Sequence, residues 1–136
     1  MTRNEFFKTY RDFLKCAIRL YEKARREGLL SLEEEIEDLD EENFKTGLRL
    51  VVDGVASEII DEIFSNIIAF EKDENERQFK IIQKRAILGL QRGENFRILF
   101  LVLNSYANLS KDEQKEIEYD LLNDSSGDSD DLDLDD

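Results

Sequence analysis

His and Cys, which carry much of the nucleophilic and transition-metal chemistry of proteins, are almost absent from this sequence. The 136 residues include no His and a single Cys, Cys16. This composition excludes a His-based catalytic triad, a His-ligated metal and an intramolecular disulfide. Cys16 lies between the apolar positions Phe13 and Ala17 and has no His to activate it, so we expect a buried, unreactive thiol. The sequence therefore predicts a protein that is not an enzyme and has no catalytic residue, cofactor or metal site.

Two acidic runs contain the oxygen ligands that hard cations prefer. The first holds eight carboxylates, at Glu33, Glu34, Glu35, Glu37, Asp38, Asp40, Glu41 and Glu42. A helix spreads such residues around its circumference, so we expect a solvated acidic face. The second run, residues 124–131, has Asp at alternate positions and Gly127, but it lacks the bidentate Glu that closes a calcium loop. We expect this run to belong to a disordered tail.

The charge of the chain is strongly negative and unevenly distributed. The net charge is −14, yet residues 1–28 carry 8 basic and 4 acidic groups. Residues 29–72 carry 3 basic and 13 acidic groups, and residues 123–136 carry 7 acidic groups and no basic one. Such a surface disfavours nucleic acid, whose phosphates require neutralising cations. We expect a protein partner of complementary charge instead.

Apolar spacing and capping residues predict an all-α fold. In residues 3–27 apolar side chains recur at alternating spacings of four and three, with a capping box at Thr2 and Glu5 and a stop at Gly28. Further helices are expected at about 31–39, 41–52, 57–71, 76–92, 96–106 and 110–122. Their expected caps are Ser31 with Glu34, Ser57, Asp73 or Asn75, Asn95, and Ser110 with Glu113.

These helices should pack as one compact bundle of about six helices with short connections. We assign the bundle to residues 1–122. Residues 123–136 combine low hydrophobicity with a single sign of charge, so they cannot bury enough surface to offset the entropy of ordering. We therefore expect them to form a disordered acidic tail.

The connection at residues 71–78 leaves two architectures open. No Gly or Pro interrupts it, so local propensity favours one continuous helix from about 57 to 92. Burial favours a hairpin, because a straight helix would expose one apolar half unless a second chain covered it. We predict the antiparallel hairpin. In it, Ile60, Ile63, Ile67 and Phe70 would face Phe79, Ile82, Ala86 and Leu90.

No segment of the sequence has the length and apolarity of a membrane span. The longest run without a charge, residues 98–110, is shorter than the ~20 residues that a span requires. The N-terminus carries charges throughout its apolar stretch, unlike a signal peptide. These features predict a cytoplasmic protein. Residues 3–27 combine aromatic residues with a basic stripe, made up of Lys8, Arg11, Lys15, Arg19 and Arg26. We expect this helix to pack into the bundle, with self-association as a homodimer and contact with a membrane surface as alternatives.

Two segments carry the resemblance to a known family. Residues 23–54 read KARREGLLSLEEEIEDLDEENFKTGLRLVVDG, and residues 86–106 read AILGLQRGENFRILFLVLNSY. The first resembles the segment that follows the second membrane helix of MotA-type flagellar stator subunits. The second resembles the segment that follows the fourth membrane helix, with Phe96 where the family usually has Pro. The resemblance implies two cytoplasmic segments joined directly, without the membrane helices that line an ion path.

The resemblance also implies a binding site and a function. Arg25 and Glu33 fall on family positions whose charges face the rotor switch protein FliG, and we include the neighbouring Arg26 and Glu34 in a partner-binding site. An ordinary solvated pair of charges is the alternative reading. The implied function is a non-conducting accessory or regulator of bacterial flagellar motility, peripheral at the motor, that binds FliG or stator subunits. The alternative is a self-assembling scaffold derived from MotA that makes no rotor contact.

Overall fold

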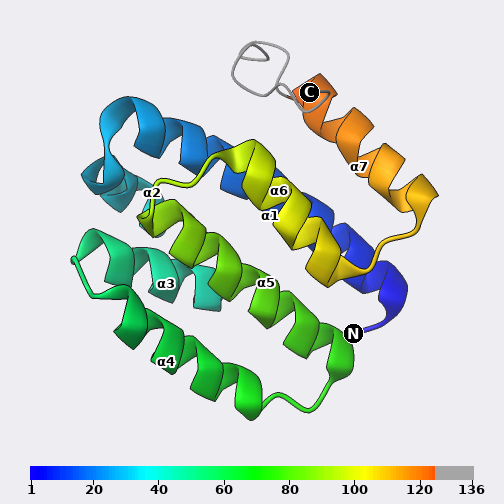
Figure 1. The fold of residues 1–136 in the computed structure, drawn as a ribbon, viewed down its shortest axis with the longest axis horizontal. Helices are drawn as coiled ribbons and strands as arrows, with labels where there is room; N and C mark the ends of the chain where they lie inside the picture. The colour runs from blue at the N-terminus through cyan, green and yellow to red at the C-terminus, as the bar shows by residue number, and fades with distance from the viewer. Residues whose placement is uncertain (125–136) are drawn as a thin grey trace.

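The computed structural model describes residues 1–124, which form seven α-helices, one 3-10 turn and no strand (Figure 1). The elements are α1 (Arg3–Glu27), η1 (Leu29–Leu32), α2 (Glu33–Ile36), α3 (Glu42–Val52), α4 (Ser57–Ala69), α5 (Glu74–Gln91), α6 (Phe96–Ala107) and α7 (Lys111–Asp124). The predicted all-helical bundle is confirmed, and an α-helix lies within or overlaps each of the seven expected segments. The predicted tail lies, from residue 125 onward, outside the described residues.

Helix α1 has the bounds that its capping residues predict. The Thr2 hydroxyl accepts a hydrogen bond from the Glu5 backbone N–H, and the Glu5 carboxylate accepts one from the Thr2 N–H, which forms the expected capping box. The apolar positions of the helix are buried, including Phe6, Tyr10 and Leu14. Because α1 has 25 residues, it extends along the whole bundle behind α6 (Figure 1).

Helix α5 is the centre of the fold. It packs against α1, α3, α4 and α6, and its side chains Ile82, Ala86 and Ile87 have no exposed surface. Helix α3 approaches α5 closely at Gly47. A Cβ atom there would lie 2.8 Å from Cγ1 of Ile87, which is nearer than carbon atoms can pack. The glycine therefore sets the distance between the two helices.

Helices α4 and α5 form the predicted antiparallel hairpin, and the continuous helix is excluded (Figure 1). The chain turns at residues 70–73, and Asp73 caps α5 by accepting a hydrogen bond of 2.8 Å from the Glu76 N–H. The predicted contact face is wrong in part. Phe70 is 84% exposed, and it is Ile60 and Phe64 that α4 buries. The reason is that α4 ends at Ala69, so Phe70 already belongs to the turn.

The connection between α5 and α6 is held by a bidentate ion pair. Both guanidinium Nη atoms of Arg85 donate to the Glu94 carboxylate, at 2.8 and 2.9 Å, and this contact lowers the pKa of Glu94. Gly89 leaves room for the pair, since a Cβ atom there would lie 2.7 Å from Oε1 of Glu94. Asn95 caps α6 as predicted, and Phe96 packs edge-on against Tyr21.

Two predicted caps are wrong. The Ser31 hydroxyl donates to the Gly28 carbonyl at 2.6 Å, within a 3-10 turn, and does not cap the following helix. Ser57 is the first residue of α4, whose N-cap is Ala56 without a side-chain hydrogen bond. Ser31 lies inside η1, and Ser57 lies one residue past the N-cap position, so neither hydroxyl is at the position that caps the following helix.

Helix α7 lies on the outer side of α1. The capping box of Ser110 and Glu113 forms as predicted. Ile117 is fully buried, and Arg11 of α1 lies 3.5 Å from the Asp120 carboxylate. The acidic face of α7 therefore covers part of the basic stripe of α1, which supports packing into the bundle as the role of that stripe.

Candidate partner-binding surface

The four predicted partner-binding residues lie on the two sides of one turn. Arg25 and Arg26 occupy the last turn of α1, and Glu33 and Glu34 open α2. All four are exposed. The turn between them lies at the end of the bundle where α1 stops and the chain reverses into α2 (Figure 1). A basic edge and an acidic edge are thus presented together at one end of the molecule.

Gly28 and Leu32 determine the shape of this turn. Gly28 has φ 90°, a conformation that residues with a Cβ atom rarely adopt, and its N–H donates to the Ala24 carbonyl at 2.8 Å. Leu32 has no exposed surface, and its turn, η1, packs against α1 and α3. The glycine ends α1, and the buried leucine anchors the returning chain. Together they position the start of α2 beside the end of α1.

Ion pairs within the chain hold part of the acidic edge. The Lys23 ammonium group donates to the carboxylates of Glu34 and, at 2.7 Å, of Glu35. These hydrogen bonds raise the pKa of Lys23, and the bond from Lys23 lowers the pKa of Glu35. Glu34 is therefore engaged by α1, whereas Glu33 extends from the turn without an ion pair within residues 1–124.

The helix dipoles account for the signs of these charges without any partner. Cations are favourable near a helix C-terminus and anions near an N-terminus, each by about 0.3–1 kcal/mol at exposed positions. The basic residues stand in the last turn of α1, and α2 begins with three acidic residues. Arg25 also interacts within the chain. The charges of these four residues therefore do not by themselves indicate a binding site.

Leu30 is the neighbour that sequence reasoning missed. It lies in η1 between the basic and acidic edges, and its side chain is 73% exposed. Leu29, Leu30 and Leu32 look alike in sequence, so no pattern shows which of them faces solvent. An exposed leucine between two charged edges is the arrangement typical of protein interfaces, where an apolar centre is bordered by a polar rim. We call Arg25, Arg26, Leu30, Glu33 and Glu34 the turn surface.

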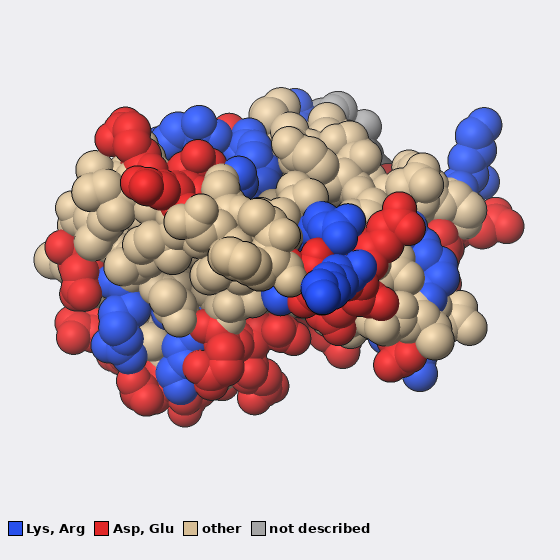
Figure 2. Space-filling view, turned by 90° about the horizontal axis from the view of Figure 1, so that it is seen from below, with Lys and Arg blue, Asp and Glu red and all other residues tan. Residues whose placement is uncertain are grey.

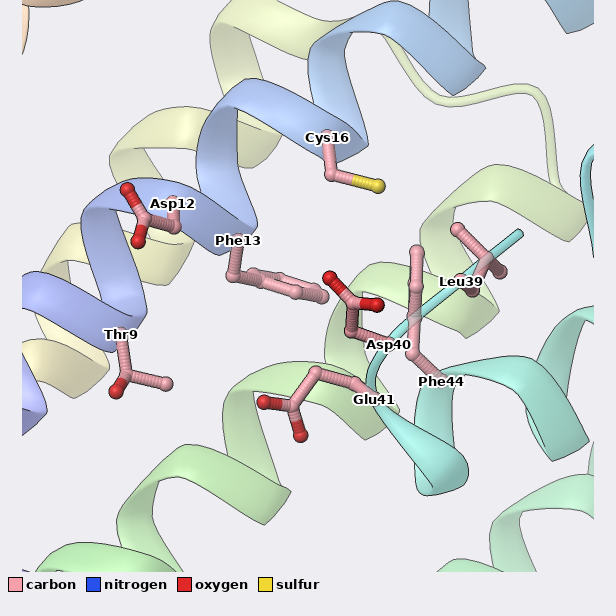
Figure 3. Close-up of a pocket in the computed structure, with 8 residues that line it drawn as sticks. All are labelled: Thr9, Asp12, Phe13, Cys16, Leu39, Asp40, Glu41 and Phe44. Atoms are coloured by element: carbon pink, nitrogen blue, oxygen red, sulfur yellow. The ribbon is translucent and has the colours of Figure 1, made fainter.

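A small cleft lies elsewhere, between the middle of α1 and the segment that leads into α3 (Figure 3). Its volume is about 220 Å³, and it is lined by Thr9, Asp12, Phe13, Cys16, Leu39, Asp40, Glu41 and Phe44. Burial raises the pKa of the Cys16 thiol, which keeps it protonated and poorly nucleophilic. Burial and the nearby Glu76 carboxylate also raise the pKa of Glu41. Nothing in this cleft activates a nucleophile.

No helix within residues 1–124 combines the length and the apolar character that crossing a membrane requires.

The sequence is similar to that of several motility proteins. It is 45% identical over 69 residues to Motility protein A of Treponema phagedenis, which covers 51% of this chain and 27% of that protein. The identity is 39% over 79 residues with Motility protein A of Borreliella burgdorferi, covering 58% and 28% of the two chains. It is 43% over 53 residues with Motility protein A of Bacillus subtilis, covering 39% and 20%.

The chain spans less than a third of the length of each of these relatives. No family model and no solved structure matches it. The similarity nevertheless recurs at 37% identity or more in proteins that carry the same name in different bacteria. Over about half its length, this chain is similar to proteins named Motility protein A.

Proposed function

We propose that this chain is a non-conducting accessory or regulatory protein of bacterial flagellar motility. It acts by binding a motor protein on the cytoplasmic side, with the rotor switch protein FliG as first candidate and stator subunits as second. The observation that carries the proposal is the similarity to several Motility protein A sequences. The residues that carry the family resemblance in the sequence include residues 23–54, which contain the whole turn surface.

The geometry of the turn surface supports this proposal. Arg26, Leu30 and Glu33 are all exposed on one short turn, with Leu30 between the two charges. A partner with a complementary pair of charges can contact both edges while it covers the leucine. Charges at the rim of an interface mainly steer association and fix orientation, and burial of the apolar centre adds affinity.

Reversing the charges of the turn surface should weaken binding to FliG. We expect Arg26→Glu and Glu33→Lys each to lower the affinity of the purified chain for the charged C-terminal domain of FliG by about three- to tenfold. The affinity of the unmodified chain should fall as salt rises, since salt screens exposed charges. Isothermal titration calorimetry at two salt concentrations measures both effects.

The matched controls are Lys115→Glu and Glu118→Lys, which reverse exposed charges on α7. They should leave the affinity unchanged. Equal losses from the α7 and turn variants would show that the effect is not specific to this turn and would remove the turn surface from the proposal. A different result would favour the self-assembling scaffold. In that case the chain would not bind FliG but would associate with itself, and the turn variants would abolish this self-association.

A further inference from the structure

The outer face of α4 carries an apolar stripe that the other described elements cover only in part. Ile59, Ile63, Ile67 and Phe70 follow one another at spacings of four, four and three, which places them along one side of the helix. Ile59 is 51% exposed and Phe70 84%, and the other two are partly exposed. Helix α4 packs mainly against α5, through the neighbouring Ile60 and Phe64. We call these four residues the α4 stripe.

The surface around the stripe is visible in Figure 2, which looks at the α4 side of the molecule. Residues other than Lys, Arg, Asp and Glu form a broad connected area there, and the charged side chains along its lower edge are mostly acidic, with a few basic ones among them. Within this area, the exposed residues of the α4 stripe form apolar surface bordered by charge, an arrangement that marks a site of interaction. The charges around the α4 stripe indicate which kind of partner would bind there.

All charged residues of the segment that carries the α4 stripe, residues 50–71, are acidic. This segment contains no Lys or Arg and five acidic residues. Asp61 is paired with Lys84 at 2.9 Å, and Glu71 with Lys80 at 2.5 Å. Glu58 and Glu62 form no ion pair within residues 1–124, although they stand one helical turn apart next to Ile59 and Ile63. Two unneutralised carboxylates therefore border the apolar stripe.

These two carboxylates argue against two occupants. A second copy of this chain, docked through the same helix, would bring Glu58 and Glu62 close to the identical acidic residues of its partner. Like charges placed opposite each other in an interface are costly. An anionic membrane surface attracts basic segments, so it would repel this acidic helix.

We infer that the α4 stripe is a docking surface for a basic amphipathic helix of another protein. Apolar side chains of that helix, spaced by three and four residues, would cover Ile59, Ile63 and Phe70. Its Lys or Arg residues would pair with Glu58 and Glu62. This surface shares no residue with the turn surface, so the inference stands independently of the proposed function.

A synthetic helical peptide tests this inference on the full chain. The probe has leucines along one side and lysines on both flanks, and a second peptide has glutamate at each lysine position. Amide NMR spectra of the isotope-labelled chain, recorded during titration, locate the contact. We expect the basic peptide to shift the amide signals of α4, and the acidic peptide to leave the spectrum unchanged.

Variants on the stripe and its acidic border provide the quantitative test. We expect Ile59→Ser, Phe70→Ser and Glu62→Lys each to weaken binding of the basic peptide by about fivefold or more. The control is Leu101→Ser, which removes a 61% exposed leucine from α6. It should leave the affinity unchanged. All four positions are solvent-accessible, so the melting temperature of each variant should stay close to that of the unmodified chain.

Three results would overturn the inference. The first is the absence of binding by the basic peptide. The second is that the basic peptide shifts the amide signals of the acidic segment 33–42 and not those of α4. This result would indicate that charge alone attracts the peptide. The third is an equal loss of affinity in Leu101→Ser and in the stripe variants.

Discussion

Replacing Phe64 with alanine is expected to lower the free energy of unfolding by about 3–5 kcal/mol. Phe64 has no exposed surface, and it is one of two residues through which α4 is buried. Its ring also reaches α3, because a Cβ atom added at Gly47 would lie 3.1 Å from Cζ of Phe64. The substitution therefore leaves a cavity where α3, α4 and α5 meet.

Phe70, the residue that follows α4, offers the control for this substitution. Phe70→Ala removes an identical side chain from a position that is 84% exposed, and it should change the stability by less than about 0.5 kcal/mol. Thermal unfolding followed by circular dichroism should show a fall in Tm of roughly 10 °C or more for Phe64→Ala only. Similar losses in both variants would mean that the α4–α5 hairpin packs through a different face.

Leu32→Ala should have the second largest effect, a loss of about 2–4 kcal/mol. Leu32 is fully buried, and it anchors η1 against α1 and α3. Its truncation removes the apolar contact that holds the returning chain, so the start of α2 should become less ordered. We therefore expect faster amide hydrogen exchange in residues 29–36, as well as a lower melting temperature.

Leu30→Ala is the matched variant, since it changes the same residue type two positions away. Leu30 is exposed, so its loss should leave the melting temperature and the exchange rates near those of the unmodified chain. If Leu30→Ala destabilised the chain as much as Leu32→Ala, the two side chains would share the anchoring role. Leu30 would then be a structural residue and not the centre of a binding surface.

The sequence was sufficient to predict most helix bounds, because the signals there are local. Thr2, Asn95 and Ser110 supply caps whose partners lie within three residues, and Gly28 supplies a stop. The hairpin required a different argument. No breaker stands between α4 and α5, so the turn follows from the need to bury two apolar faces and from the capping carboxylate of Asp73.

The errors arise where tertiary contacts override local patterns. Ser31 has the spacing of a capping residue, but it lies in the 3-10 turn that follows Gly28. There its hydroxyl donates to the Gly28 carbonyl and does not cap α2. Phe70 continues the apolar period of α4 and yet falls beyond its end. In the turn surface, the sequence predicts the charged residues but not Leu30, because the exposure of Leu30 depends on how η1 rests on α1 and α3.

The most direct test of the proposed function is site-specific photo-crosslinking in a flagellated bacterium that carries this protein. A photoreactive amino acid replaces Leu30 in the turn surface, and in a parallel strain it replaces Tyr119, an exposed residue of α7. We predict that position 30 yields a crosslinked product with a flagellar motor protein, FliG or a stator subunit, and that position 119 does not. The absence of any motor protein among the products from position 30, or the same products from both positions, would contradict the proposed function.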